Sequence, residues 1–167
     1  SLIYNWWINK GLFQKSKTIC FAGTLSRAFD FKPIYSLAKY LRSKKININF
    51  VICGSGEELY KIKKMMSDFD NVFFPGWIGP NEIKVLYDNS LCMLAPYKNF
   101  KDFQNSLPNK IYDALSHDLP IVTPLDGHLK KIIEKFQVGI HYQNDNELCK
   151  KVHNLITNKK LQSEMKK

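Results

Sequence analysis

The sequence predicts a doubly wound α/β domain: a Rossmann-like parallel sheet of about six strands with helices on both faces. Short apolar runs bounded by glycine or proline alternate with amphipathic stretches from residue 18 to residue 157, which gives five or six β-α repeats. The length of 167 residues is that of one ordinary domain. We therefore expect a single hydrophobic core.

The apolar runs predict strands that are buried on both faces, as in a parallel sheet. In chain order they read TICFAG, NINFVICG, NVFFPG, SLCMLAP and LPIVTP. The stretches between them repeat apolar residues at three- and four-residue spacing or open with proline, which predicts helices. The helical stretches read KPIYSLAKYLRSK, EELYKIKKMM, PNEIKVLYDNS and, near the end of the chain, NELCKKVHNLI.

The first 17 residues break this alternation. Tyr4, Trp6, Trp7 and Phe13 come before the first strand, so a free-standing domain would have to cover a sizeable aromatic patch. We interpret residues 1–17 as a linker or interdomain edge that packs on something outside the chain, and residues 18–167 as the folded domain.

The composition restricts the partners and the compartment. Lys and Arg outnumber Asp and Glu by 25 to 15, so anionic partners are favoured: phosphates, nucleic acid or an anionic membrane surface. No apolar run approaches the roughly 20 residues that cross a bilayer. The four cysteines are widely spaced and three lie in strand-like runs, which predicts reduced thiols and a cytoplasmic protein.

The loops that follow the strands are the candidate binding sites, because ligands of parallel α/β sheets bind at the carboxyl ends of the strands. In the first loop, Gly23 allows backbone amides to approach an anion, and Arg27 could pair with a phosphate. A glycine turn with surface cations explains this loop equally well. In the second loop, Gly54 begins a dinucleotide fingerprint, but Leu59 stands where its third glycine belongs. We assign Gly54 to the rim of a ligand.

The third loop, FFPGWIGPNE, contains no charged side chain as it leaves its strand. Around Trp77 and Ile78, backbone N–H and C=O groups could read a flat base. A single tryptophan more often packs in a core or an interface, and that alternative is favoured for Trp77.

The fourth loop, SLPNKIYDALSHDLPIV, opens a predicted helix. Pro108 suits the first helical turn, so the amides around Ser106, Asn109 and Lys110 should form an anion site. Lys110 and Asp113 share one face, with Asp113 about 7 to 8 Å along the helix from Pro108. This spacing fits a phosphate at one end and vicinal hydroxyls further on, as in a nucleoside diphosphate. A solvated helix face is the alternative.

The remaining motifs predict no metal and no cofactor, and they leave the catalytic residues unidentified. Asp68 and Asp70 match the Asp-x-Asp of some metal-dependent sugar transferases, but they lie in a polar turn before a strand. The histidines have no ligand spacing, and neither a Gly-Lys-Ser/Thr phosphate loop nor a nucleophile elbow is present.

From Thr18 onward, the order of FAGTL, FVICGSGEE, VFFPGWI, LAPY, SLPNKIYDALSHDLPIVTP and QVGIHY resembles the C-terminal, donor-binding half of a GT-B glycosyltransferase. The similarity is to family 4, or group 1, and to related capsule or lipopolysaccharide enzymes. It implies a nucleoside-diphosphate sugar as the donor and a glycan or lipid-linked acceptor. That acceptor would bind an N-terminal domain preceding this chain, so the chain alone should be inactive.

The resemblance also implies a role for each loop. Gly76 to Ile78 would read the base, and Gly23 would face the sugar phosphates. The amides from Ser106 through Leu107 to Lys110 would face the diphosphate.

The resemblance further implies a pair of acidic residues at the last helix. Asp113 stands at the second position, which binds the ribose, and Asn105 replaces the acid at the first position, which approaches the donor sugar. Thr24 and Phe29 stand where the family has Arg and Lys. Either Arg27 or Lys110 is then left to neutralise the phosphates.

Two other functions stay open at this stage. A sugar-nucleotide epimerase of GT-B architecture would bind the same donors and change the sugar without an acceptor. A non-catalytic nucleotide- or nucleic-acid-binding module would use the charge of +10 directly. We favour the transferase, which needs no nucleic-acid partner and is expected in the cytoplasm, with peripheral contact to the inner face of the membrane.

Overall fold

The computed structural model describes residues 1–13 and 16–166. Within these residues, six strands form one parallel sheet in the order β3-β2-β1-β4-β5-β6, which confirms the predicted fold class. The strands are β1 (Lys17–Ala22), β2 (Ile48–Cys53), β3 (Val72–Gly76), β4 (Cys92–Leu94), β5 (Ile121–Thr123) and β6 (Gly139–His141).

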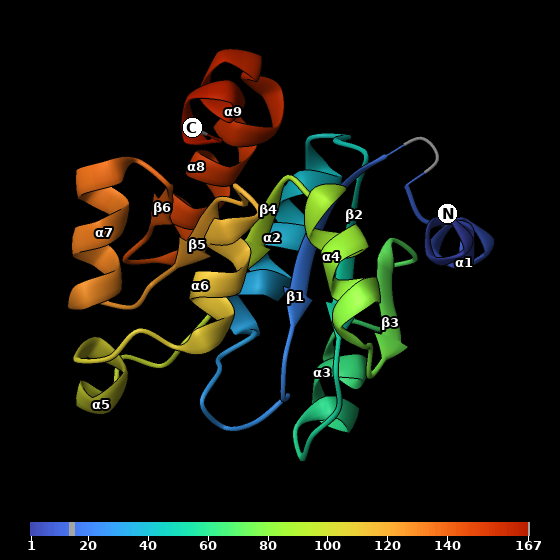
Figure 1. The fold of residues 1–167 in the computed structure, drawn as a ribbon, viewed down its shortest axis with the longest axis horizontal. Helices are drawn as coiled ribbons and strands as arrows, with labels where there is room; N and C mark the ends of the chain where they lie inside the picture. The colour runs from blue at the N-terminus through green and yellow to red at the C-terminus, as the bar shows by residue number, and fades with distance from the viewer. Residues whose placement is uncertain (14–15, 167) are drawn as a thin grey trace.

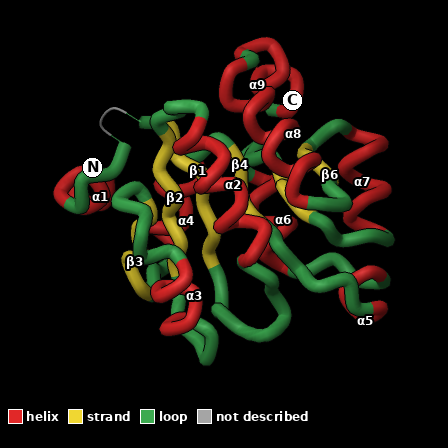
Figure 2. The backbone as a smooth tube through the Cα atoms, turned by 180° about the vertical axis from the view of Figure 1, so that it is seen from behind, coloured by secondary structure: helices red, strands yellow, loops and turns green. Residues whose placement is uncertain are grey.

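Helices cover both faces of the sheet. Figure 1 shows α4 and α6 in front of the strands, and the opposite view in Figure 2 shows α2, α3 and α8 in front. The helices are α1 (Leu2–Asn9), α2 (Lys32–Ser43), α3 (Leu59–Met65), α4 (Pro80–Asp88), α5 (Lys101–Gln104), α6 (Asn109–Ser116), α7 (His128–Phe136), α8 (Asp145–Thr157) and α9 (Lys159–Met165).

The apolar pattern of the sequence accounts for the core. Five of the six residues of β1 and five of the six of β2 are buried, as expected for strands with helices on both faces. In α2 the buried residues are Ile34, Leu37, Ala38 and Leu41, which recur at three- and four-residue spacing and so form one stripe against the sheet.

The amino-terminal segment packs on this chain. Trp7 and Leu12 are fully buried, the Trp7 and Phe13 rings lie 5.6 Å apart, and α1 lies beside α4 (Figure 1). The expectation that the segment packs only on something outside the chain is therefore wrong for Trp7, although Leu2 is exposed. Residues 14 and 15 of the expected linker lie outside the described residues, and the division into linker and domain stays a prediction.

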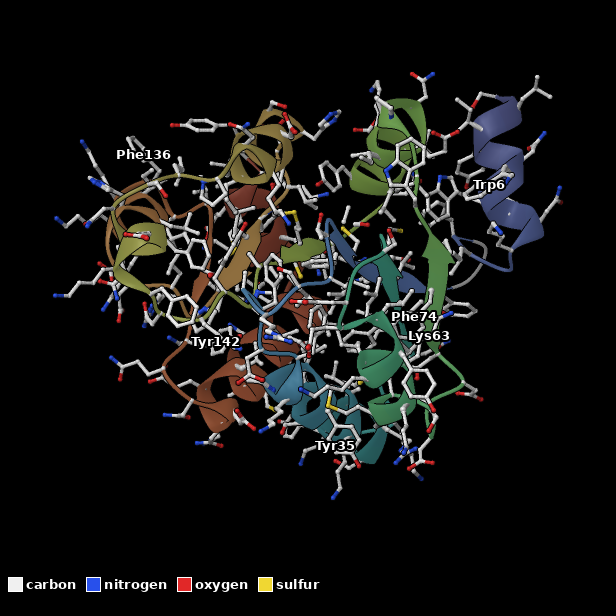
Figure 3. All side chains as sticks on the ribbon, turned by 90° about the horizontal axis from the view of Figure 1, so that it is seen from below. Trp6, Tyr35, Lys63, Phe74, Phe136 and Tyr142 are labelled. Carbon is white, nitrogen blue, oxygen red and sulfur yellow. The ribbon has the colours of Figure 1, made fainter. Side chains whose placement is uncertain are left out.

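The carboxyl ends of the strands meet at one edge, at the bottom of Figure 1 and facing the viewer in Figure 3. The chain direction of the connections reverses between β1 and β4, the position at which such sheets form a ligand crevice. Cys20, Cys53 and Cys92 lie in strands and are buried free thiols, as predicted, and burial raises the pKa of Cys20 to about 12. Among the described helices, none is long and apolar enough to span a membrane.

Candidate functional site

A pocket of about 200 Å³ lies at the carboxyl edge of the sheet, between the loops after β1, β2 and β3 and the helices α4 and α6. Six of the predicted site residues line it: Gly23, Gly54, Trp77, Ile78, Lys110 and Asp113. Three larger cavities lie elsewhere among the described residues. Those of about 460 and 430 Å³ lie beside α7 and α9, and one of about 230 Å³ lies between Leu12 and the β3 residues Phe73 and Phe74. None of the three is lined by a predicted site residue.

Backbone hydrogen bonds hold the three loops of the pocket close together. The Gly23 amide donates to the Cys53 carbonyl at 3.1 Å, and the Gly54 amide donates to the Gly76 carbonyl at 2.8 Å. Gly54 has a φ of +126°, and a Cβ there would overlap the Gly23 carbonyl oxygen. The glycine at position 54 is therefore required by the approach of two backbones as well as by its conformation.

Lys110 projects from the first turn of α6 under the loop that follows β1. Its Nζ lies 4.6 Å from the centroid of the Phe29 ring, 4.9 Å from that of Phe21 and 5.9 Å from that of Tyr97. A Cβ on Gly23 would overlap the same Nζ. No carboxylate of the described residues forms an ion pair with Lys110, and burial lowers the pKa of its ammonium to about 8.

Asp113 lies one turn further along α6 and is exposed. Within the described part of the chain its carboxylate has no ion-pair or hydrogen-bond partner, so its oxygens are available to a ligand. The buried Tyr87 of α4 lines the pocket opposite it. Burial raises the pKa of Tyr87, and nearby charges including Asp113 add to the effect, so this phenol is neutral at physiological pH.

Trp77 and Ile78 continue from the end of β3 into the pocket. Trp77 is 77% exposed, so it does not pack in the core of this chain, and the alternative that it packs in an interface stays a prediction. Ile78 is buried and fixes the backbone of the loop. The backbone between Gly76 and Ile78 thus borders the pocket beside an exposed indole.

Arg27 does not line the pocket. Its guanidinium is exposed and lies 3.5 Å from the Glu57 carboxylate and 4.0 Å from that of Glu58. Between the two candidates for phosphate neutralisation, the pocket thus contains Lys110, while Arg27 is paired with acids outside it.

The residues just before α6 lie outside the pocket lining. Asn105 directly follows α5 and is exposed, and the Ser106 hydroxyl donates to the Asp102 carbonyl at 2.8 Å. Leu107 packs against the core. The helix begins at Asn109, one residue later than expected, because Pro108 has a ψ of 144° and is still extended.

No pattern in the sequence indicates the aromatic residues around Lys110. Phe21 is one apolar residue of a buried strand, Phe29 follows in the next loop, and Tyr97 follows β4. The adjacency of β1 and β4 in the sheet and the antiparallel bridge between Phe29 and Tyr97 bring the three rings together.

Comparisons with known proteins agree with the fold. The model of the family described as Glycosyl transferases group 1 matches residues 6–167. The chain belongs to this family. Comparison with curated protein sequences gives no match.

Solved structures of group 1 glycosyltransferases and related enzymes share the fold. WaaG, a glycosyltransferase involved in lipopolysaccharide biosynthesis, has a TM-score of 0.76 at 16% identity, over 98% of this chain and 44% of WaaG. A Staphylococcus aureus TarM variant, in a complex that includes UDP, has 0.75 at 20% identity, over 92% of this chain and 31% of TarM. The C-terminal domain of LpcC from Francisella tularensis has a TM-score of 0.74 at 14% identity, over 98% of this chain and 86% of the LpcC domain.

The chain thus spans less than half of WaaG and about a third of TarM, but most of the isolated LpcC domain. The similarity is therefore between the fold of this chain and the fold of one domain of these enzymes. Among the described residues, no group of three or more His, Cys, Asp or Glu side chains is arranged to hold a metal ion.

Proposed function

We propose that the pocket binds the nucleoside diphosphate of a nucleotide sugar, and that the chain is the donor-binding half of a glycosyltransferase. One observation carries this proposal. Lys110 and Asp113 line the same pocket, yet among the described residues neither charged group has an ion-pair or hydrogen-bond partner. An unpaired ammonium and an unpaired carboxylate one helical turn apart suit a ligand with an anionic end and a hydroxyl-bearing end.

Each end of the ligand has a distinct part of the pocket. The diphosphate lies against Lys110 and the Gly23 loop, where the ammonium supplies the positive charge. The ribose hydroxyls donate to Asp113. The base lies against the backbone from Gly76 to Ile78, beside the exposed indole of Trp77.

The acceptor lies outside this pocket. We propose a glycan or lipid-linked acceptor bound by a preceding N-terminal domain, in a cytoplasmic enzyme that touches the inner face of the membrane peripherally. Structures of longer relatives such as WaaG support a second domain. Donor binding is proposed to need no metal ion and no other cofactor.

Calorimetry on two substitutions of α6 tests the proposal. The ligand is the tightest binder among UDP, GDP, dTDP, CDP and ADP, compared with its own nucleoside. A charge-assisted hydrogen bond contributes about 1.5 to 3 kcal/mol, so Asp113→Asn should weaken nucleoside and diphosphate alike by roughly 10- to 100-fold. Lys110→Ala should weaken the diphosphate and leave the nucleoside unchanged.

Asp118→Asn is the matched control. Asp118 is exposed just beyond the end of α6 and has a φ of 52°, a conformation that asparagine also adopts. The Asp118→Asn variant should bind every ligand with the affinity of the parent. If none of the five diphosphates binds at millimolar concentration, the proposed function is wrong. Measurements of product would separate a transferase from an epimerase, which changes the sugar without an acceptor.

A further inference from the structure

The Lys110 ammonium is held by aromatic faces instead of by an acid. We call Phe21, Phe29 and Tyr97 the aromatic seat, because the centroids of all three rings lie within 6 Å of Nζ. Gly23 closes the other side, since even a methyl group there would overlap Nζ. Ring faces attract a cation without neutralising its charge, so the seat leaves that charge available to a ligand.

The other ionisable groups around the pocket do not supply a counter-charge. Tyr97 and Tyr87 are buried and their pKa values are raised, so both phenols are neutral. The pKa of the Cys53 thiol at the end of β2 is raised by burial as well. Asp113, on α6 itself, is exposed and forms no ion pair with Lys110.

The remaining charged neighbours lie in the flanking loops. Arg27, in the loop after β1, is paired with Glu57 and Glu58. Lys98, in the loop after β4, is a second cation and has no acidic partner among the described residues. A diphosphate entering the pocket is then the first anion that Lys110 meets at close range.

We propose that the aromatic seat makes diphosphate binding depend on proton uptake by Lys110, and that Phe29 and Tyr97 are positioning residues for the phosphate-binding ammonium. This inference rests on the proposed function and deepens it. In the empty pocket the ammonium is desolvated and unpaired, which favours its neutral form. A bound diphosphate supplies the missing negative charge and favours the protonated form.

The pH dependence follows from the direction of the pKa change. With a pKa of about 8 in the empty pocket, Lys110 is mostly charged at pH 7 and only about one tenth charged at pH 9. The terminal phosphate, with a pKa near 6, keeps a constant charge over this range. Diphosphate affinity should therefore fall roughly tenfold from pH 7 to pH 9. The matching nucleoside controls for titration of the base and should show no such loss.

Two phenylalanines provide a matched pair of variants. Phe29 and Phe31 are both buried and both meet the Phe21 ring edge to face, at 5.0 and 5.2 Å, but only Phe29 lies against Lys110. Phe29→Leu removes a ring that restricts the Lys110 side chain, so diphosphate binding must then restrict that side chain itself. We expect diphosphate affinity at pH 7 to fall roughly three- to tenfold, with nucleoside affinity unchanged. Phe31→Leu should change neither the diphosphate affinity nor the nucleoside affinity by more than about twofold.

Calorimetry at pH 7 and pH 9 on the parent, Phe29→Leu, Phe31→Leu and Lys110→Gln completes the test. Lys110→Gln should bind the diphosphate weakly and equally at both pH values, because it has no proton to lose. Diphosphate affinity that is equal at pH 7 and pH 9 in the parent overturns this inference alone. An equal loss of diphosphate affinity in Phe29→Leu and Phe31→Leu overturns it as well. Failure of every nucleoside diphosphate to bind overturns the proposed function and this inference with it.

Discussion

Replacing Lys110 by methionine should make the folded protein more stable at neutral pH. Methionine keeps a long, unbranched side chain with similar helix propensity, so the change removes the ammonium with little effect on α6. An ordinary surface lysine would give almost no change. The difference arises because Lys110 is desolvated without an acidic partner.

The magnitude follows from two opposing contributions. The pKa of Lys110 is lowered from 10.5 to about 8. Since one pKa unit corresponds to about 1.4 kcal/mol, keeping the charged form there costs about 3.5 kcal/mol of unfolding free energy. The attraction of the aromatic faces offsets roughly 0.5 to 2 kcal/mol of this. Lys110→Met should therefore raise the unfolding free energy by about 1.5 to 3 kcal/mol at pH 7.

The sign of the pH dependence gives a second check. The unfolded chain keeps this proton up to about pH 10.5 and the folded chain only up to about pH 8. The unfolding free energy of the parent therefore gains a contribution as the pH rises between these values, when Lys110 becomes neutral. The advantage of Lys110→Met should shrink from pH 7 to pH 9.5.

Urea denaturation of the parent, Lys110→Met and Lys131→Met at both pH values measures these differences. Lys131 is exposed on α7, so its substitution should change the unfolding free energy by less than about 0.5 kcal/mol at either pH. A Lys110→Met protein that is less stable than the parent at pH 7 would refute the reasoning. An advantage that does not change with pH would refute it as well, because it would then not come from the charge.

Three further outcomes are expected. Gly54→Ala should lower the unfolding free energy by more than about 3 kcal/mol in urea, because a positive φ and overlap with the Gly23 carbonyl act together; a loss below 1 kcal/mol would contradict the close approach. Asn99→Ala removes hydrogen bonds to Asp126 and Gln104, so it should lower the unfolding free energy by about 1 kcal/mol. Calorimetry should also show weaker diphosphate binding. Unchanged binding would show that other contacts hold the loop before α6. EDTA should leave diphosphate affinity within about twofold, and a strict need for magnesium would favour a metal-dependent transferase.

The fold was predictable because each repeat has a local signature. The predicted strand TICFAG corresponds to β1, which begins and ends one residue earlier in the chain. The apolar stripe from Ile34 to Leu41 is the buried face of α2. Gly23 directly follows β1, and Pro33 lies in the first turn of α2. The sequence did not indicate that Trp7 is buried, because that depends on how α1 packs beside α4 and no local pattern records it.

The lining of the candidate pocket was predictable in part for a related reason. Gly23, Gly54 and Trp77 each follow a strand, and a parallel sheet places all strand ends at one edge. The partners of individual side chains could not be read in this way. Arg27 has the same charge as Lys110 and lies nearer to Gly23 in the sequence, yet it is exposed beside Glu57 and does not line the pocket. Which of the two cations lies in the pocket depends on contacts between segments that are far apart in the sequence, and no local pattern specifies these contacts.

The interpretation of Lys110 and Asp113 as an ordinary solvated pair can be judged against the other helices of the same chain. Lys84 with Asp88 on α4, and Lys151 with Glu147 on α8, are lysine–acid neighbours one turn apart, and each pair is in contact, at 2.9 and 3.5 Å. On α6 the same opportunity exists at three-residue spacing, but Lys110 turns away from Asp113 toward the aromatic seat. Helix geometry alone would favour the pair. The separation of the two charges therefore has to come from the packing of the pocket, and it leaves each charge facing the space in which a diphosphate and a ribose would lie.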